Sequence, residues 1–274
     1  MQNHEPIWFN NEPRTTEQPV EQKPYSIFIA TPVHSEVSIH YTQSLLELQK
    51  WAWKEKVKIQ FQIMKSSLIT SGRNMCVGAF LKSDCTHMLF IDSDIAFNAD
   101  AVGRLVRADK EVISIPYPLK DMNWDKGLRM VQEGKIKDVR DLRNKAFYRY
   151  PFKVPDTQNI KIKDGVIEVT HAPTGFMMIK RQVFDKMIKA YPHMRIDQDQ
   201  VINGKNVRVE NYWNFFDTWF DPEKHTYLGE DFAFCKRWSD LGGKCYAWIS
   251  DYITHVGEHQ YTARFLDELI PTDN

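Results

Sequence analysis

Hydrophobic and polar positions in the first half of the chain form alternating blocks that predict strands and helices in turn. Short apolar runs predict buried strands at 25–32, 86–91 and 111–117, and alternation predicts another at 57–64. Ser71 is the expected N-terminal cap of a helix at 72–83. Helical periodicity fills the stretches between these strands, at 41–56, 72–83 and 99–109. Strands that alternate with helices predict an α/β fold with a mixed, mostly parallel sheet flanked by helices.

The second half of the chain has weaker periodicity. Residues 119–158 are charged and show no clear repeat, and 160–169 read as a hairpin that turns at Asp164-Gly165. The stretch QVINGK, at 200–205, reads as a loop. Further elements are predicted as a strand at 172–180, a helix at 181–191, a helix at 230–243 that Gly242 ends, and a final strand at 244–250.

Composition narrows the class of protein. The 274 residues carry 36 Lys and Arg against 36 Asp and Glu, and this balance argues against a general nucleic-acid binder, which needs clustered positive charge. No apolar run approaches the length of a membrane span, and the polar start of the chain lacks a secretory pattern. The four cysteines lack CxxC spacing, which indicates neither a zinc site nor a disulfide framework, and Cys76 and Cys235 are expected to be buried thiols. These features predict a cytoplasmic protein without a membrane span.

The most informative motif is a pair of aspartates, Asp92 and Asp94, that directly follows the apolar run at 86–91. Ligands of open parallel sheets collect at the carboxyl ends of strands, which is where this pair falls. Adjacent carboxylates repel each other, and a divalent cation such as Mg²⁺ or Mn²⁺ removes that cost, although a polar turn is the alternative. The same spacing recurs at Asp197-Gln-Asp199, where no uninterrupted apolar run precedes it, and there we expect a structural role.

Three further segments extend this picture. The stretch SGRNMCVGAFLKSDCTHMLFIDSD, at 71–94, is followed by APTGFMMIK at 172–180, YLGEDFAFCKRWSDLGGK at 227–244 and ITHVG at 253–257. In this order and spacing they resemble the Arg-Asn helix with its Asp-x-Asp strand, the glycine loop, the Glu-Asp motif and the C-terminal histidine of the GT-A fold. The resemblance covers roughly 26–256. It is to nucleotide-sugar-dependent glycosyltransferases, especially family-2-like members.

The resemblance implies metal-dependent transfer of a sugar from a nucleotide-diphosphate sugar to an acceptor hydroxyl. Asp94 would bind the metal directly, and Asp92 would bind it through water or hold the ribose or sugar of the donor. His255 would be a further metal ligand, with His259 as a rival, and an imidazole beside carboxylates favours Mn²⁺ over Mg²⁺. A satisfied, partly buried histidine is the alternative for His255.

Other residues are implied in binding the donor. Arg73 would contact phosphate or orient Asp92, unless it is a surface cation of its helix. Thr174 and Gly175 would lie where the backbone approaches the transferred sugar, which glycine permits because it lacks a Cβ, unless the glycine serves a tight turn. The rest of the donor, including its base, would lie near strand-end residues Thr31, Pro32, Val33, Ser66 and Ser93.

Catalysis is implied at Glu230 and Asp231, which open a predicted helix. The helix dipole would keep Asp231 ionised, and capping of the helix is the alternative role for both acids. Asp231 would take the proton from the acceptor hydroxyl as its oxygen attacks the anomeric carbon, with inversion at the sugar. Similar motifs also suit a retaining enzyme, so the stereochemistry stays open here.

The segment NYWNFFDTWFD, at 211–221, concentrates aromatic rings without strand or helix periodicity. Sugars stack their C–H faces on such rings, so part of the segment is expected to line a sugar site, with Trp213 and Trp219 as test positions. A packed cover over the core is the alternative, and we expect it to claim half of the rings or more.

Rival functions stay open beside this one. A nucleotidyltransferase usually carries a Gly-rich, basic loop after its first strand, and ATPVHSEVSIH at 30–40 has no glycine. A non-catalytic sugar- or nucleotide-binding protein and a metal-dependent hydrolase are the others. The main prediction is a GT-A glycosyltransferase that takes a nucleotide-sugar donor and a glycan or other hydroxyl acceptor, without nucleic acid. Its boundaries are one domain at 25–262, divided into a nucleotide-binding half at 25–118 and an acceptor-binding half at 119–262, between tails at 1–24 and 263–274.

Overall fold

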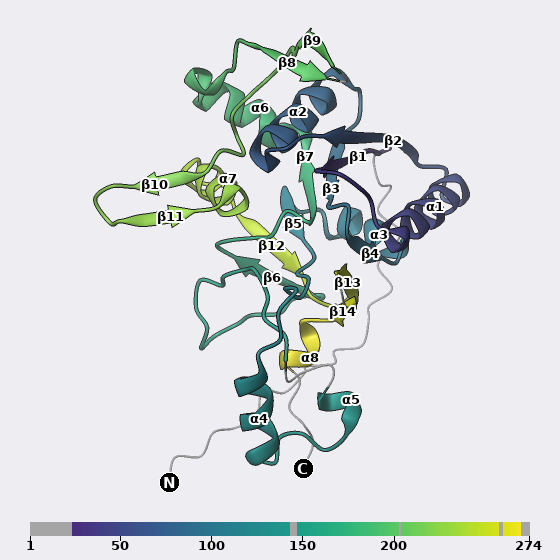
Figure 1. The fold of residues 1–274 in the computed structure, drawn as a ribbon, viewed down its shortest axis with the longest axis vertical. Helices are drawn as coiled ribbons and strands as arrows, with labels where there is room; N and C mark the ends of the chain where they lie inside the picture. Colours follow the sequence, from purple (N-terminus) through teal and green to yellow (C-terminus); the bar gives the residue numbers. More distant parts are fainter. Residues whose placement is uncertain (1–23, 143–146, 203, 258–259, 270–274) are drawn as a thin grey trace.

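A mixed seven-stranded sheet forms the centre of the molecule in the computed structural model, which describes residues 24–142, 147–202, 204–257 and 260–269 (Figure 1). Its strands lie in the order β2-β1-β3-β7-β5-β12-β6. β1, β2, β3, β5 and β12 run in one direction, while β7 and β6 run against their neighbours. The strand bounds are β1 (Ser26–Val33), β2 (Lys58–Lys65), β3 (His87–Ile91), β5 (Val112–Ser114), β6 (Val166–Val169), β7 (Phe176–Lys180) and β12 (Cys245–Trp248). The predicted α/β fold class is confirmed.

Helices cover both faces of this sheet because its strands are apolar on both sides. Along β1, Ile27 and Ile29 join one core cluster and Phe28 and Ala30 join the other, as the two-residue period of a strand requires. The first cluster includes residues of α1 (Ile39–Lys54) and α3 (Asp100–Ala108). The second includes residues of α2 (Ile69–Lys82), α6 (Arg181–Ala190) and α7 (Glu230–Asp240).

A second, three-stranded sheet lies beside the carboxyl end of β3. It consists of β4 (Ile95–Phe97), β13 (Ile253–Val256) and β14 (Gln260–Ala263), in the order β14-β13-β4 with antiparallel pairing. His255 pairs with Ile95, and the Val256 N–H donates to the Asp94 carbonyl at 2.7 Å. The expectation that the strand at 244–250 is the last one is therefore wrong, and the added strand brings His255 back to the aspartate motif.

Several other local predictions can be compared with the structure. α2 begins at Ile69, so Ser71 lies inside its first turn and is not its cap; its Oγ lies 3.0 Å from the Tyr212 hydroxyl. The turn at Asp164-Gly165 is confirmed by positive φ angles of 52° and 77°, and Gly242, at 78°, ends α7 as expected.

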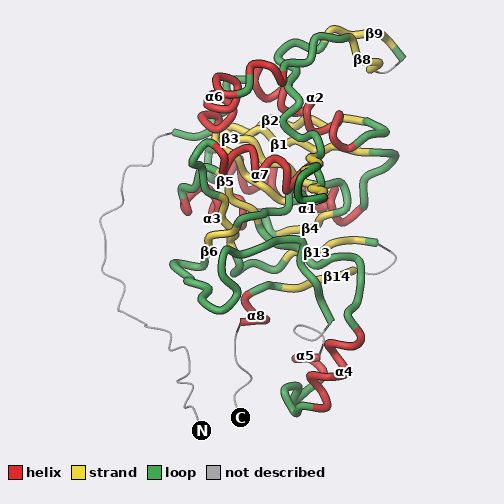
Figure 2. The backbone as a smooth tube through the Cα atoms, turned by 90° about the vertical axis from the view of Figure 1, so that its left-hand side faces the viewer, coloured by secondary structure: helices red, strands yellow, loops and turns green. Residues whose placement is uncertain are grey.

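Two hairpins and several short helices complete the described chain. β8 (Asp199–Ile202) and β9 (Lys205–Arg208) form a hairpin where a loop was predicted. β10 (Trp219–Asp221) pairs with β11 (Thr226–Leu228). The helices are α4 (Trp124–Gln132), α5 (Val139–Asp141), a 3₁₀ turn (Pro192–Met194) and α8 (Leu266–Leu269). Figure 2 shows that α4 and α5 project from the body at the end opposite to β8 and β9.

The chain ends and the cysteines bear on the remaining predictions. Residues 1–23 of the expected N-terminal tail and the rival ligand His259 lie outside the described residues. Within the expected C-terminal tail, Ala263 and Asp267 are buried. Cys76 in α2 and Cys235 in α7 are buried free thiols, as predicted. In the part of the chain that the structure describes, every helix is too short or too polar to cross a bilayer.

Candidate active site

Arg73 of α2 is the centre of a buried cluster of charges at the carboxyl end of β3. Its Nη2 donates to Asp92 Oδ2 at 3.2 Å, and its Nε donates to Glu230 Oε1 at 3.3 Å. Nη1 lies 3.0 Å from Asp92 Oδ1 as an ionic contact that lacks hydrogen-bond geometry. The side chain is 3% exposed, so the alternative of a surface cation is wrong. Arg73 instead holds the Asp92 and Glu230 carboxylates together across the chain.

Electrostatics keep this arginine charged in spite of its burial. Burial alone would lower the pKa of Arg73, but the Asp92 and Glu230 carboxylates outweigh it and raise the pKa. Arg73 Nη1 and Asp92 Oδ1 remain without a hydrogen-bond partner among the described residues. The two atoms lie 3.0 Å from each other, so each has the opposite charge as its neighbour although the contact lacks hydrogen-bond geometry.

A second group of charges forms where β13 meets β4. His255 Nε2 lies 3.5 Å from Asp94 Oδ2, and the ammonium of Lys120 lies 2.5 Å from the same oxygen. His255 Nδ1 lies 2.9 Å from the Pro118 carbonyl oxygen, which can only accept a hydrogen bond, so Nδ1 carries the proton. Nε2, the ring nitrogen nearer to Asp94, is then the one that could bind a metal ion, as in histidines whose other nitrogen donates to a carbonyl.

The Asp94 carboxylate is ionised at neutral pH. Burial raises its pKa, but the neighbouring His255 and Lys120 side chains outweigh burial, and the pKa is lowered. Asp92 does not complete a metal site with this pair, because its carboxylate faces Arg73. Among the described residues, no three His, Cys, Asp or Glu side chains are grouped closely enough to hold a metal ion. The structure therefore brings two of the three predicted ligands together.

Tyr117 accounts for the glycine at 175. A Cβ on Gly175 would lie 2.5 Å from Tyr117 Cε1, so the ring requires glycine there whether or not a sugar approaches. Burial, and then the nearby Asp92 carboxylate, raises the pKa of Tyr117 well above its ordinary value. Gly175 accepts the Asp92 N–H at 2.9 Å, and Thr174 is 1% exposed. The Gly175 carbonyl thus fixes the backbone of Asp92, and the Thr174 side chain is buried.

Asp231, in the first turn of α7, is half-buried beside the arginine cluster. Burial, followed by the charge of Glu230, raises the pKa of Asp231 to about 6 in spite of its place in the first turn of the helix. Its Oδ1 accepts the Phe232 N–H at 2.7 Å. A carboxylate with this pKa is mostly ionised at neutral pH and is a stronger base than an ordinary aspartate.

The predicted base-binding residues are less accessible than expected. Thr31 is fully buried, and its Oγ1 lies 2.5 Å from the Tyr41 hydroxyl, so its side chain is not exposed to a ligand. Pro32 and Val33 are also buried. The half-buried Ser66 donates from Oγ to the Leu68 carbonyl at 2.9 Å. Ser93 is half-buried and accepts the Ser38 N–H at its carbonyl.

The aromatic segment divides into core residues and surface residues. Tyr212, Trp213, Phe215 and Phe216 are buried, and the Phe216 ring stacks on Phe234 at 4.5 Å. Trp213 therefore belongs to the packed cover over the core, with its ring stacked on Phe215. Beyond them, Phe220 is 59% exposed. Trp219 and Phe220 line a cavity of about 410 Å³.

Sequence reasoning missed Lys120 and Tyr117 as members of the site. Tyr117 ends a stretch that reads only as a strand, and Lys120 opens the charged segment that has no periodicity. Neither position carries a motif that distinguishes it from a core tyrosine or a surface lysine.

Comparisons with known proteins assign no family. No protein-family model matches the chain, and no curated protein sequence matches it. Solved structures that resemble it include A197 from STIV, with 16% identity and a TM-score of 0.44 over 85% of this chain and 86% of that one. A glycosyltransferase involved in the glycosylation of the major capsid of PBCV-1 has 8% identity and a TM-score of 0.31, over 61% of this chain and 66% of that one. UDP-glucose pyrophosphorylase complexed with UDP-glucose has 8% identity and a TM-score of 0.37, over 84% of this chain and 93% of that one. These likenesses are too weak to assign activity, which must be argued from the site itself.

Proposed function

We propose that the chain is a metal-dependent glycosyltransferase that moves a sugar from a nucleotide-diphosphate sugar to an acceptor hydroxyl, with inversion. The observation that carries this proposal is the contact between His255 and Asp94, at 3.5 Å. The sequence motifs suggested that two acids and a distant histidine meet, and the proximity of His255 to Asp94 supports that suggestion. The Arg73 cluster and Asp231 lie in the same part of the fold, at the end of β3 and the start of α7.

The residues present fit a divalent ion as a site with few protein ligands. Asp94 and His255 would hold it, and Mg²⁺ or Mn²⁺ commonly takes its other ligands from water and substrate phosphates. A nitrogen ligand favours Mn²⁺. When bound, the ion would neutralise the charge that grows on the departing diphosphate. Lys120 supplies a further positive charge at the same place.

The other residues have roles that follow from their contacts. Arg73 holds Asp92 in a fixed orientation, through contacts to both oxygens of its carboxylate. Asp231 is the general base. The acceptor oxygen forms the new bond to the anomeric carbon as the bond to the diphosphate breaks, and the acceptor proton passes to the Asp231 carboxylate. Attack opposite the leaving group inverts the configuration of that carbon.

A thermal-shift panel tests the donor class. UDP-, GDP-, CMP- and dTDP-sugars would each be added with and without Mn²⁺, because a ligand that binds only the folded state raises its melting temperature. One nucleotide class should raise the midpoint, only with metal, and Asp94→Ala should abolish the shift. No shift with any nucleotide, or an undiminished shift in Asp94→Ala, would contradict the proposal.

Product analysis separates glycosyl transfer from its rivals. A glycosyltransferase releases a nucleoside diphosphate in step with acceptor modification, whereas a nucleotidyltransferase consumes or releases pyrophosphate. Release of free sugar with and without acceptor would instead indicate a hydrolase. Binding without any turnover would indicate a sugar- or nucleotide-binding protein.

A further inference from the structure

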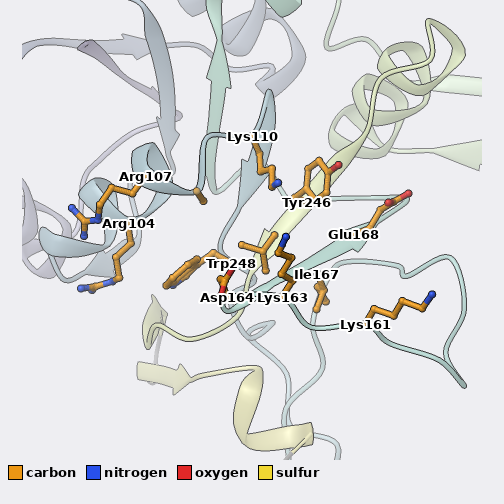
Figure 3. Close-up of a pocket in the computed structure, with 12 residues that line it drawn as sticks. Arg104, Arg107, Lys110, Lys161, Lys163, Asp164, Ile167, Glu168, Tyr246 and Trp248 are labelled. Atoms are coloured by element: carbon orange, nitrogen blue, oxygen red, sulfur yellow. The ribbon is translucent and has the colours of Figure 1, made fainter. Parts of the chain in front are cut away.

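A cavity of about 520 Å³ lies on the sheet beside α3 and shares no lining residue with the candidate active site (Figure 3). Its volume is within the range of small-ligand sites. Two rings of β12, Tyr246 and Trp248, belong to its wall, and two acids, Asp164 and Glu168, lie at it. Positive side chains come to it from α3, the start of β5 and the turn before β6: Arg104, Arg107, Lys110, Lys161 and Lys163.

Part of this positive charge is already neutralised. Arg104 donates two hydrogen bonds to the Asp251 carboxylate, at 2.7 Å and 2.6 Å. In the described part of the chain, by contrast, no carboxylate lies within ion-pair distance of Arg107, Lys161 or Lys163. All three of these side chains are exposed. Glu168 is paired with Lys244, which lies outside the lining. The cavity therefore has an excess of positive charge in a chain whose net charge is zero.

The aromatic wall is held in a fixed orientation. Cys245 and Ala247 face the core, so the alternation of β12 turns Tyr246 and Trp248 to the opposite face, where both are only partly covered. Trp248 Nε1 donates to Asp251 Oδ2 at 2.7 Å. The backbone of Gly165 lies against the same ring, since a Cβ there would lie 3.4 Å from Trp248 Cη2. A ligand ring stacked on Trp248 would thus meet a preorganised surface.

We propose that this cavity binds an anionic oligosaccharide. Sugar rings would pack on Trp248 and Tyr246, and acid groups along the chain would pair with Arg107, Lys161 and Lys163. In Figure 3, Lys161 and Lys163 stand apart from each other, which suits charges spread over successive sugars better than a single phosphate.

A polynucleotide also carries rings and spread charges, but the two acids favour the sugar chain. Asp164 and Glu168 can accept hydrogen bonds from hydroxyls, of which an oligosaccharide offers several on each sugar and a DNA strand offers almost none. That the bound chain is the acceptor of the transfer reaction rests on the proposed function; the binding itself does not.

Isothermal titration calorimetry with defined probes tests the proposal. The probes are oligogalacturonate, with one carboxylate per sugar, a neutral maltooligosaccharide of the same length, and single-stranded oligothymidylate of the same charge. We expect oligogalacturonate to bind at low salt, to weaken as salt rises, and to bind more tightly than either other probe. Failure of oligogalacturonate to bind, or tighter binding of oligothymidylate, would overturn the proposal.

Charge-reversed variants locate the site. Lys161→Glu combined with Lys163→Glu should weaken oligogalacturonate binding about tenfold or more, because two favourable pairs become repulsive. The matched control reverses two exposed lysines elsewhere, Lys189→Glu with Lys205→Glu, and should leave binding unchanged. An equal loss of oligogalacturonate affinity in both variants would show that the probe responds to the overall charge of the protein. That result would overturn the assignment of binding to this cavity.

Hydrogen exchange gives a readout that needs no variant. Bound oligogalacturonate should slow amide exchange in 161–168 and 245–248, and protection confined to other segments would contradict the assignment. Binding of a nucleotide sugar with Mn²⁺, measured on the same preparations, tests the proposed function separately. The Lys161 and Lys163 substitutions are expected to leave that binding intact, so failure of one proposal is distinguishable from failure of the other.

Discussion

The chain carries the same Asp-x-Asp spacing twice, and the two copies have opposite surroundings. Asp92 and Asp94 follow the buried strand β3; one meets the buried Arg73 and the other meets His255. Asp197 and Asp199 lie on the exposed β8–β9 hairpin at an outer end of the molecule (Figure 2). Both acids of that second copy face a single arginine of the same hairpin, Arg208.

The difference shows that spacing alone carries little chemistry. In the first copy, side chains from distant parts of the sequence converge on the acids, and burial strengthens every interaction among them. In the second copy, the partner comes from the adjacent strand and the pair is surrounded by water. The apolar run before Asp92 is the feature of the sequence that separates the two.

Loss of the proposed base should have the largest effect. Asp231→Asn removes the proton acceptor at nearly constant shape and should lower kcat by about 10² to 10⁴. Steady-state assays with the nucleotide sugar that the thermal-shift panel selects would measure this loss. The same substitution in the second motif, Asp197→Asn, should leave kcat unchanged, and comparable losses in both would remove the distinction between the two regions.

Loss of the arginine of each region compares their stability. Arg73→Met leaves the Asp92 and Glu230 carboxylates buried without their partner and should lower the free energy of unfolding by about 3 to 5 kcal/mol. Arg208→Met breaks exposed pairs and should lower it by at most about 1 kcal/mol. Urea denaturation at pH 7 measures both, and equal losses would mean that the Arg73 cluster is not buried as described.

The raised pKa of Asp231 predicts that ionisation of this side chain lowers the stability of the fold and raises the activity. An acid whose pKa is raised to about 6 on folding stabilises the fold while protonated, and that contribution is lost as pH rises from about 4 through 6. With allowance for partial exposure, Asp231→Asn should gain about 2 kcal/mol at pH 8 and little at pH 4. Activity of the unchanged protein should rise with pH with an apparent pKa near 6. A variant less stable at pH 8 would contradict this account.

Lys120→Met should have a smaller effect, in opposite directions on two properties. The Lys120 ammonium lies against the oxygen of Asp94 that a metal ion would use, so its removal should tighten Mn²⁺ binding severalfold. The same change should lower kcat, because Lys120 also supplies charge to the leaving group. Mn²⁺ titration followed by electron paramagnetic resonance, together with kinetics, checks the pair of effects; Lys224→Met is the control on an exposed lysine.

The layers of the fold could be predicted from the sequence because each depends on a local pattern. The apolar runs that became β1, β3 and β7 are long enough to show burial, and α6 has a clear apolar stripe. The β8–β9 hairpin was missed although Asn203-Gly204 is a signal for a two-residue turn. Its strands are only four residues each and their valines, Val201 and Val207, are exposed, so no clear hydrophobic alternation supported that signal.

The candidate site could be predicted only in part because its partners meet through tertiary structure. The approach of His255 to Asp94 depends on β4, a strand of three residues that has no pattern of its own. The accessibility of the Thr31 side chain depends on Tyr41 of α1, whose hydroxyl lies 2.5 Å from Thr31 Oγ1. The pKa of Asp231 depends on burial, which outweighs the helix dipole that the sequence shows.

The most direct test of the central claim is the affinity for Mn²⁺, measured by electron paramagnetic resonance in the presence of the nucleoside diphosphate that the thermal-shift panel selects. The account predicts that Asp94→Asn and His255→Gln each weaken Mn²⁺ binding about tenfold or more, while Asp197→Asn combined with Asp199→Asn leaves it unchanged. Equal affinity in all of these variants, or a loss confined to the second motif, would contradict it.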